Sequence, residues 1–232
     1  MQRMLQRIFG RLRSGADQTL ARPIARAYHR NWYEAGNTWM HSKWMGFHIQ
    51  QCPLDLQRYQ ELIFRLKPRA IVQTGVNQGG SLLFFAHMLD ALGGPHSDGI
   101  VIGIDIQLSA RAKELDHSRI HLIEGDSKGV DVLNRVRELV GDRSPILVSL
   151  DSDHRCDHVL GELRAFAPLV GPGGALVIED TNLNGHPVLP HFGPGPREAL
   201  EQWLPSSSDR FVEIGAEEDP NWLSFHSWFE RR

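Results

Sequence analysis

Short apolar runs alternate with amphipathic segments along most of the chain, starting at residue 69. Apolar runs that lack a polar residue at every second position predict strands at 70–75, 100–106, 120–125, 145–151 and 174–180. Apolar residues at helical spacing predict helices between them, at 80–92, 108–115, 127–140 and 156–168. Strands without polar alternation are typical of a parallel sheet that is covered on both faces. The pattern therefore predicts an α/β fold of βαβ units with a Rossmann-like, doubly wound sheet.

Two flanking regions extend this pattern. Apolar residues trace one helical face over 53–68, and a Pro/Gly turn leads into another predicted helix at 193–204. Two more candidate strands follow, at 210–214 and 222–229. They bring the expected sheet to seven strands and complete the predicted main domain, which we assign to residues 51–232.

Residues 1–50 are expected to form a helical and aromatic extension. The first twelve carry apolar side chains at helical spacing, and residues 1–30 contain seven arginines and a single acid, Asp17. This predicts a basic amphipathic helix, which either packs on the domain or a second subunit or contacts anionic membrane lipid or a partner surface. Five large aromatic side chains follow and either pack on the domain or wall a ligand pocket: Trp32, Tyr33, Trp39, Trp44 and Phe47.

Composition narrows the class of protein. Of the 232 residues, 41% are hydrophobic and 23% are charged, as in globular proteins that bury a core. The net charge of -3 gives no reason to expect nucleic acid as the partner. The two cysteines, Cys52 and Cys156, lie far apart, which favours a reducing compartment. Because the sequence shows neither a signal peptide nor an apolar run of about 20 residues, we expect a cytoplasmic protein.

The first predicted strand leads into a glycine-rich turn, QTGVNQGGS (73–81), which supplies candidate binding residues: Gln73, Gly75, Gly79, Gly80 and Ser81. Glycines let the backbone approach a ligand closely, and the N-terminus of the following helix can face an anionic group. The G-x-x-x-G-G spacing differs from the G-x-G-x-x-G of dinucleotide-binding folds. This difference argues against a nicotinamide-dependent oxidoreductase.

Acidic residues end the next two strands. Asp105 can accept hydrogen bonds from both hydroxyls of a ribose, whereas Asp126, followed by Ser127, either binds a ligand or caps the next helix. In a doubly wound sheet these strand ends lie together. They describe a nucleoside site with a shortened phosphate cradle, which suits S-adenosylmethionine better than NAD because it carries no pyrophosphate.

Three carboxylates follow the fourth and fifth strands, and they predict a metal site formed by Asp151, Glu179 and Asp180. Carboxylates this close repel one another unless a cation compensates them, and oxygen ligands suit Mg²⁺. Asp153 is an alternative to Asp151 as a ligand, and surface or capping acids are the alternative to a metal site. His154 is either a general base or a residue of the first helical turn that bonds to backbone.

The sequence resembles the cephalosporin hydroxylase family over roughly residues 50–200, on the stretches SLDSDH, VIEDT and NGHPV…GPGP. Despite that name, the family consists of class I S-adenosylmethionine-dependent O-methyltransferases, and its members act on rhamnosyl groups and in natural-product biosynthesis. The resemblance implies a seven-stranded sheet whose last strand is antiparallel. It also implies methyl transfer to a hydroxyl of a sugar or natural product, in an enzyme that forms homo-oligomers.

The resemblance assigns roles to the candidate residues. It implies that Gly75 and Asp105 hold the amino-acid end and the ribose of the cofactor, and that Asp126 reaches the adenine. It likewise implies that His154 is the base and that three acids bind Mg²⁺: Asp151, Glu179 and Asp180. Gln73 departs from the family, which usually has an acid there to bind the methionine ammonium.

Two alternatives stay open. A metal-dependent hydrolase or Fe(II) oxygenase would require at least two histidines to converge on one site, from among His154, His158, His186 and His191. A non-catalytic relative that acts as a binding subunit would fit the exchange at Gln73. The proline- and glycine-rich segment 182–196, called the flap below, is expected to face the substrate.

Overall fold

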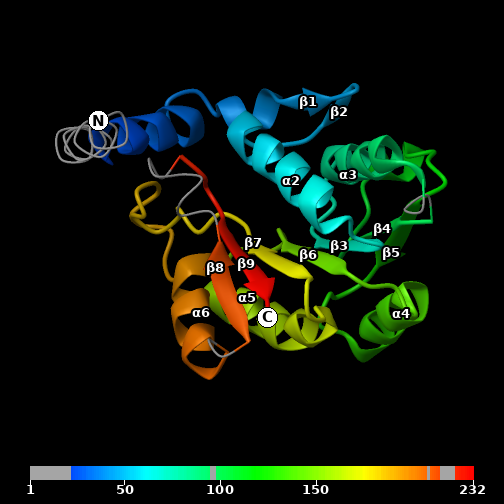
Figure 1. The fold of residues 1–232 in the computed structure, drawn as a ribbon. Coiled ribbons are helices and arrows are strands. Elements are labelled where there is room, and N and C mark those ends of the chain that lie inside the picture. Colours follow the sequence, from blue (N-terminus) through cyan, green and yellow to red (C-terminus); the bar gives the residue numbers. More distant parts are fainter. Residues whose placement is uncertain (1–21, 95–97, 208–209, 215–222) are drawn as a thin grey trace, which may run out of the picture.

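The computed structural model describes residues 22–94, 98–207, 210–214 and 223–232 (Figure 1). The basic amphipathic helix expected near the N-terminus lies outside the described residues. Seven strands form the main sheet: β3 (Ala70–Thr74), β4 (Ile100–Asp105), β5 (Ile120–Glu124), β6 (Ile146–Leu150), β7 (Ala175–Ile178), β8 (Phe211–Ile214) and β9 (Ser227–Arg231). No described helix is long and apolar enough to cross a membrane.

The strand order is β5-β4-β3-β6-β7-β9-β8. The five strands β5, β4, β3, β6 and β7 are all parallel to one another, whereas β9 is antiparallel to both β7 and β8. This topology confirms the predicted doubly wound sheet with an antiparallel last strand. The first strand of the main sheet along the chain, β3, lies in its centre. The chain then runs outward through β4 to β5 and returns to β6 on the other side of β3, so the strand order reverses between β3 and β6. Ligands of such sheets bind at this switch point, outside the carboxyl ends of the strands.

Helices cover both faces of the sheet, as the apolar strands require. The helices α2 (Pro53–Leu66) and α3 (Gly80–Leu92) lie on one face, opposite α4 (Val130–Val140), α5 (Cys156–Phe166) and α6 (Pro196–Trp203) (Figure 1). Successive residues of β3 alternate between two hydrophobic clusters. Ala70 and Val72 pack in the cluster with α4, α5 and α6, whereas Ile71 packs in the cluster with α2 and α3.

Element boundaries differ from the predictions where turns intervene. The helix expected at 108–115 is reduced to a 3₁₀ turn, Ala112–Glu114. The next helix begins at Val130 rather than residue 127, because residues 126–129 form a turn in which the Gly129 amide donates to the Asp126 carbonyl. The strand predicted over 174–180 ends at Ile178, just before Asp180 takes a left-handed backbone conformation.

The described part of the extension contains structure that the sequence pattern did not predict in detail. Residues 22–33 are helical, and a small hairpin pairs β1 (Lys43–Trp44) with β2 (Phe47–His48). Trp44 packs edge-on against Phe84 of α3 and donates a hydrogen bond to His87. This hairpin therefore lies against α3, and residues 36–52, which include it, are called the strap below.

Candidate active site

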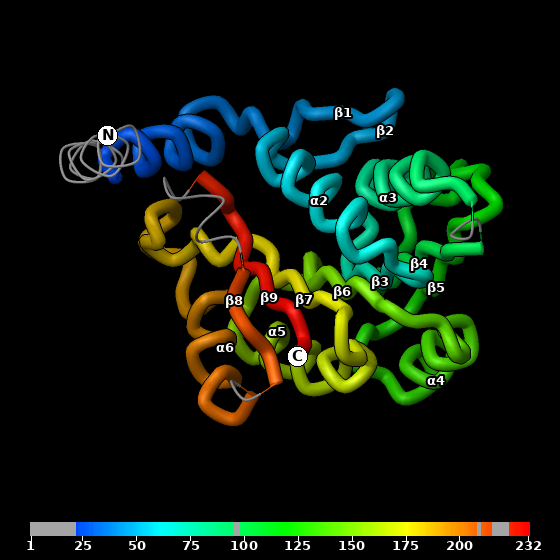
Figure 2. The backbone as a smooth tube through the Cα atoms, viewed as in Figure 1, coloured from blue at the N-terminus to red at the C-terminus, as the bar shows by residue number. Residues whose placement is uncertain are grey.

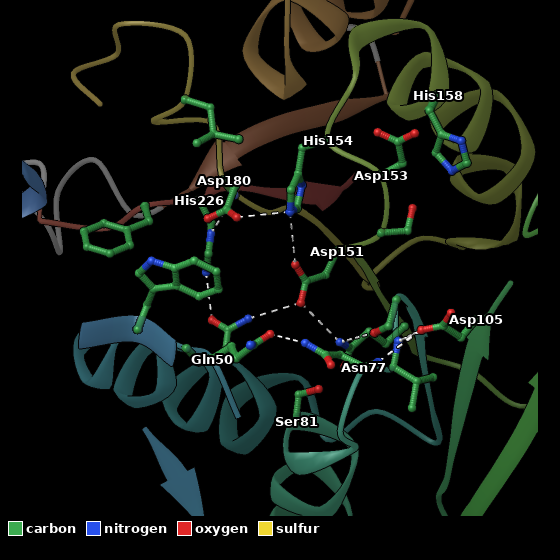
Figure 3. Close-up of a pocket in the computed structure, with 18 of the residues that line it drawn as sticks. Gln50, Asn77, Ser81, Asp105, Asp151, Asp153, His154, His158, Asp180 and His226 are labelled. Atoms are coloured by element: carbon green, nitrogen blue, oxygen red, sulfur yellow. Dashed lines mark hydrogen bonds and ion pairs between the residues drawn. The ribbon is translucent and has the colours of Figure 1, made fainter. Parts of the chain in front are cut away.

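A cavity of about 740 Å³ opens at the carboxyl ends of the central strands (Figure 3). It lies at the switch point of the sheet, where doubly wound folds bind their ligands. Most of the predicted site residues line it: Gln73, Gly75, Ser81, Asp105, Asp126, Ser127, Asp151, His154 and Asp180. The prediction that these strand ends converge is therefore correct. Gly79, Gly80 and Glu179 are not among the residues that line the cavity.

The glycines of the β3–α3 turn allow close backbone packing. Gly75 has a positive φ of +80°, and a Cβ there would lie 1.9 Å from the carbonyl oxygen of Asp151. A Cβ at Gly80 would lie 2.4 Å from the carbonyl oxygen of His48, in the strap. Gly79 caps α3 at a φ of +86°. These glycines therefore bring the turn against the end of β6 and the strap against α3.

Asp105 fixes the same turn from the neighbouring strand. Its Oδ2 accepts hydrogen bonds from the amides of Val76 (2.8 Å) and Asn77 (3.1 Å), and its Oδ1 accepts one from the amide of Gln107 (3.1 Å). A carboxylate offers about four lone-pair sites, so three amide contacts leave room for a ligand hydroxyl. Asp105 lies at the edge of the cavity opposite Asp180 (Figure 3).

The loop after β5 is held by a buried carboxylate. Glu162 of α5 is completely buried, and its Oε1 accepts hydrogen bonds from the hydroxyls of Ser127 (2.6 Å) and Ser152 (2.7 Å). The side chain of Ser127 is thus committed to the protein, whereas Asp126 is exposed and bonds to the Lys128 amide. Asp126 is not the cap of α4, since Gly129 occupies that position.

Gln73 bridges the glycine turn and the carboxylates. It is 1% exposed, and its Nε2 donates to the carbonyl of Gly75 (2.8 Å) and to Oδ2 of Asp151 (3.3 Å). Because both partners accept, the orientation of the amide is fixed. Its Oε1 has no hydrogen-bond partner among the described residues. This oxygen can accept a hydrogen bond from a cationic group of a ligand.

Asp151, His154 and Asp180 form the centre of the site. Nε2 of His154 lies 3.2 Å from Oδ2 of Asp180 and 4.0 Å from Oδ1 of Asp151, between the two carboxylates (Figure 3). The potential ligand atoms of the three lie within 4.8 Å of one another. Burial, together with the charges of Glu179 and Asp180, raises the pKa of Asp151 well above its ordinary value. A divalent cation would remove this repulsion, and the oxygen-rich donor set suits Mg²⁺.

Glu179 lies behind the cavity wall. It is 1% exposed, and its Oε1 accepts hydrogen bonds from the hydroxyls of Tyr59 (2.6 Å) and Ser149, while its Oε2 accepts one from Gln51. These donors compensate its charge without a metal. Asp153, the alternative ligand, is exposed and bonds to the amide of Arg155 (3.0 Å), outside the central group.

The C-terminal segment supplies a histidine that sequence reasoning missed. Nδ1 of His226 accepts a hydrogen bond from the Asp180 amide (3.0 Å), so Nε2 carries the proton and donates to Oε1 of Gln51 (3.0 Å). Gln51 in turn contacts Asp151 and Glu179. The register of β9 against β7, which pairs Ile178 with Ser227, places His226 there. No sequence pattern indicates this register.

The extension also reaches the site. The hydroxyl of Tyr33 donates a hydrogen bond to Oδ2 of Asp180 (2.7 Å), and Trp32 and Trp39 line the cavity beside it. The aromatic residues of the extension thus do both things that the sequence suggested, since Trp44 packs on the domain and Trp39 walls the cavity. Which aromatic would contact a carboxylate was not predictable from the sequence.

The flap contributes apolar side chains to the cavity, and neither of its two histidines, His186 and His191, lines it. Leu183, Leu189 and Phe192 line the cavity, whereas His186 contacts Glu198 of α6 (3.0 Å). Among the described residues, the group able to hold a metal ion contains one histidine, His154. The hydrolase or oxygenase alternative needs two, so the geometry does not favour it. His158 lines the cavity, and its Nε2 lies 3.3 Å from Oε1 of Glu162.

Comparisons with known proteins give a consistent result. A family model described as "Rhamnosyl O-methyltransferase/CmcI" matches residues 36–228. The chain is 38% identical over 184 residues to a rhamnosyl O-methyltransferase of Mycobacterium leprae, covering 78% of this chain and 77% of that protein. It is 34% identical over 194 residues to the rhamnosyl O-methyltransferase of Mycobacterium tuberculosis strain H37Rv, covering 82% of this chain and 78% of that protein.

Solved structures share the fold. A CmcI structure with Mg and SAM superposes with a TM-score of 0.64 at 22% identity, covering 83% of this chain and 77% of that one. The MycE methyltransferase of the mycinamycin biosynthetic pathway, with Mg and SAH, superposes with a TM-score of 0.53 at 23% identity, covering 75% of this chain and 48% of that one. The match of the family model over most of the sequence, together with the 38% and 34% identity to the two mycobacterial proteins, confirms the resemblance seen in the sequence. The chain belongs to the rhamnosyl O-methyltransferase/CmcI family.

Proposed function

We propose that this protein is an S-adenosylmethionine-dependent, Mg²⁺-assisted O-methyltransferase that methylates a hydroxyl of a sugar-containing acceptor. The observation that carries the proposal is the group formed by Asp151, His154 and Asp180 at the rim of the switch-point cavity. Membership of the family and the names of its relatives support the same activity.

The glycine-turn side of the cavity would hold the cofactor. Asp105 would accept hydrogen bonds from the ribose, Gly75 and Gln73 would hold the amino-acid end, and Asp126 would face the adenine. Ser81 would lie beside the amino-acid end, and Ser127 would act through its backbone because its hydroxyl is bonded to Glu162. S-adenosylmethionine supplies an electrophilic methyl group. The protein's part is to hold that methyl group and the acceptor oxygen close together.

Asp151 and Asp180 would hold Mg²⁺, and the buried Glu179 is the third proposed ligand. When bound, Mg²⁺ lowers the pKa of a hydroxyl that it contacts. Glu179 would have to exchange the hydrogen bond from Gln51 for the cation, whereas the bonds from Tyr59 and Ser149 engage its other oxygen.

His154 would take the proton from the acceptor hydroxyl. Its Nε2 points to the same space as the carboxylates, 3.2 Å from Asp180, and it is partly exposed to the cavity. A base in this position is within reach of an oxygen that approaches the carboxylates. The aromatic walls formed by Trp32, Trp39 and Phe192 suit the apolar faces of a sugar ring.

The direct test is transfer of a labelled methyl group from S-adenosylmethionine to a panel of rhamnosides in the presence of MgCl₂. We expect a methyl ether product, loss of activity with EDTA and its return with added Mg²⁺. His154→Ala should lower kcat by about 10²–10⁴-fold, and Asp180→Asn should abolish turnover. Both variants should still bind S-adenosylhomocysteine. Full activity in EDTA or in Asp180→Asn would contradict the metal role, and no transfer to any acceptor would favour a non-catalytic binding subunit.

We also propose how the chain is divided, how it associates and where in the cell it lies. We propose that residues 1–50 form an extension to the methyltransferase domain at 51–232, that the protein self-associates, and that the basic N-terminal segment contacts membrane surfaces peripherally. Both cysteines are free and buried, which supports a reducing compartment such as the cytoplasm.

A further inference from the structure

Tyr33 contacts the proposed metal site from outside the part of the chain that the family shares. Its hydroxyl donates a 2.7 Å hydrogen bond to Oδ2 of Asp180, the same oxygen that lies 3.2 Å from Nε2 of His154. The family model begins at residue 36, so Tyr33 lies before the matched region. The match to the family model therefore assigns no role to Tyr33.

The helical stretch that carries Tyr33 is anchored on two sides. Oε1 of Glu34 accepts a hydrogen bond from the amide of Leu189 in the flap (2.8 Å). The ring of His29 packs against Phe225 with centroids 4.4 Å apart, and its Nδ1 lies 3.3 Å from Nδ2 of Asn182. Because these contacts involve the flap and the C-terminal segment, they fix the helix over the carboxyl end of β7 and the amino end of β9.

The Tyr33 side chain itself is held in place. Its ring stacks on Trp39 of the strap, with centroids 5.7 Å apart and 26° between the planes, and meets the Phe225 ring edge-on. Burial and the nearby carboxylate of Asp180 raise the pKa of Tyr33 well above its ordinary value. A phenol has an ordinary pKa of about 10, so the hydroxyl is protonated at neutral pH and donates this hydrogen bond.

Asp180 is a residue whose orientation needs such support. It has a φ of +54°, in the left-handed region that residues other than glycine rarely occupy, and its amide is tied to His226. The backbone is thus fixed, but the carboxylate can still rotate about its side-chain bonds. Tyr33 donates to one oxygen and leaves the lone pairs of the other for a cation.

We propose that Tyr33 is a positioning residue of the metal site, which holds the carboxylate of Asp180 in the orientation that binds Mg²⁺. The inference rests on the proposed function, since it assumes that Asp180 is a ligand. Groups that hydrogen-bond a ligating carboxylate orient it, and their removal typically weakens metal binding by about 10–100-fold. The N-terminal extension is then part of the active site and does more than cover it.

Calorimetric titration of the full-length protein with MgCl₂ tests the proposal. Tyr33→Phe removes one oxygen and keeps the ring that stacks on Trp39, so we expect an unchanged fold and Mg²⁺ affinity about tenfold weaker. The matched control is Tyr28→Phe, the same substitution in the same helical stretch, because the Tyr28 hydroxyl contacts Sγ of Cys52 (2.8 Å) instead of a carboxylate. Its Mg²⁺ affinity should equal that of the wild type.

The outcomes separate this role from the proposed function. An affinity of Tyr33→Phe within about twofold of the wild type overturns the role of Tyr33 while the metal site stands. An equal loss in Tyr28→Phe also overturns it, because docking of the helix would then explain the effect. If the wild-type protein takes up no Mg²⁺, the proposed metal site fails and the role of Tyr33 fails with it. Affinity for S-adenosylhomocysteine should be the same in all three proteins.

Discussion

Asp180 is contacted by side chains from three separate parts of the chain. Its carboxylate contacts Tyr33 and His154, and its amide is bonded to His226. A non-glycine residue in a left-handed conformation costs about 1–2 kcal/mol, and such strain persists where the surroundings fix the residue. Three contacts from three separate parts of the chain supply that constraint here.

Gln73 changes the charge of the site. A carboxylate at this buried position would add a fourth negative group next to Asp151, whereas the amide donates a hydrogen bond to it. The neutral side chain therefore reduces the repulsion that raises the pKa of Asp151. In the proposed cofactor site, the ammonium group of S-adenosylmethionine would meet a neutral acceptor, Oε1 of Gln73.

Glu198 makes a testable contribution to stability that depends on pH. Burial alone would raise the pKa of this carboxyl, but hydrogen bonds from the Gly195 amide, Asn184 and His186 outweigh burial and lower the pKa from 4.5 to about 2. Stability from a depressed acid is present above its unfolded-state pKa and is lost as pH falls toward its folded-state pKa. The full shift corresponds to about 3 kcal/mol, and partial exposure reduces this to about 1–2 kcal/mol.

Glu198→Gln should therefore lower the free energy of unfolding at pH 7 by about 1–2 kcal/mol, and its gap to the wild type should narrow between about pH 5 and pH 3. Urea denaturation at several pH values measures this. Glu201→Gln is the control, because Glu201 lies on the same helix in an exposed ion pair with Arg197 and should change stability little. A gap for Glu198→Gln that stays constant with pH would contradict the assigned role.

The positions of site residues were predictable where they follow from strand order alone. Asp105, Asp151, His154 and Asp180 were found because parallel strands present their carboxyl ends at one edge, whatever the details of packing. Tyr33, Gln51 and His226 were not, since they lie in segments whose position depends on tertiary contacts. No sequence pattern distinguishes a tyrosine, glutamine or histidine that reaches the site in this way from one that packs elsewhere.

At the scale of elements, two loops are tied together by one helix. Glu162 of α5 accepts hydrogen bonds from Ser127, in the loop after β5, and from Ser152, in the loop after β6. The first loop adjoins the proposed adenine position, and Ser152 follows Asp151. The proposed cofactor and metal sides of the cavity therefore share one buried anchor.

The contact between the β3–α3 turn and the end of β6 gives a sharp prediction. Gly75→Ala would place a methyl group 1.9 Å from the Asp151 carbonyl and force alanine to a φ of +80°. We expect a loss of about 3 kcal/mol or more in the free energy of unfolding. Gly171→Ala is the control, because no heavy atom lies within 4 Å of the Cβ position there, and it should shift stability by less than about 0.5 kcal/mol. Equal urea midpoints for the two variants would refute the close contact.

Most helices and strands were predictable from the sequence, and the ones that were missed or misplaced have physical reasons. Apolar runs located each parallel strand to within one or two residues, because burial on both faces requires such runs. The hairpin β1–β2 escaped prediction, since each of its strands has two residues and packs through Trp44 onto α3. The start of β9 was predicted at residue 222 instead of Ser227, because the apolar residues Leu223 and Phe225 precede the strand.

At the scale of the whole molecule, distant parts of the chain enclose one cavity. The helical stretch 22–33, the strap, the flap and residues 223–226 gather around the carboxyl ends of the sheet (Figure 2). The sheet supplies the carboxylates and the binding loops, and these four segments supply the aromatic walls. This division explains how a shared fold can serve different acceptors, since the walls can vary while the strand ends stay the same.

Calorimetric titration with S-adenosylhomocysteine, with and without MgCl₂ and with NADH as a control, tests the central claim most directly. Asp105, the proposed ribose ligand, lines the cavity, whereas the glycine turn beside it lacks the spacing of pyrophosphate-binding loops. We predict binding of S-adenosylhomocysteine at a single site in both conditions and none of NADH. Absence of S-adenosylhomocysteine binding with and without Mg²⁺ would contradict a methyltransferase site and leave a cavity for another ligand.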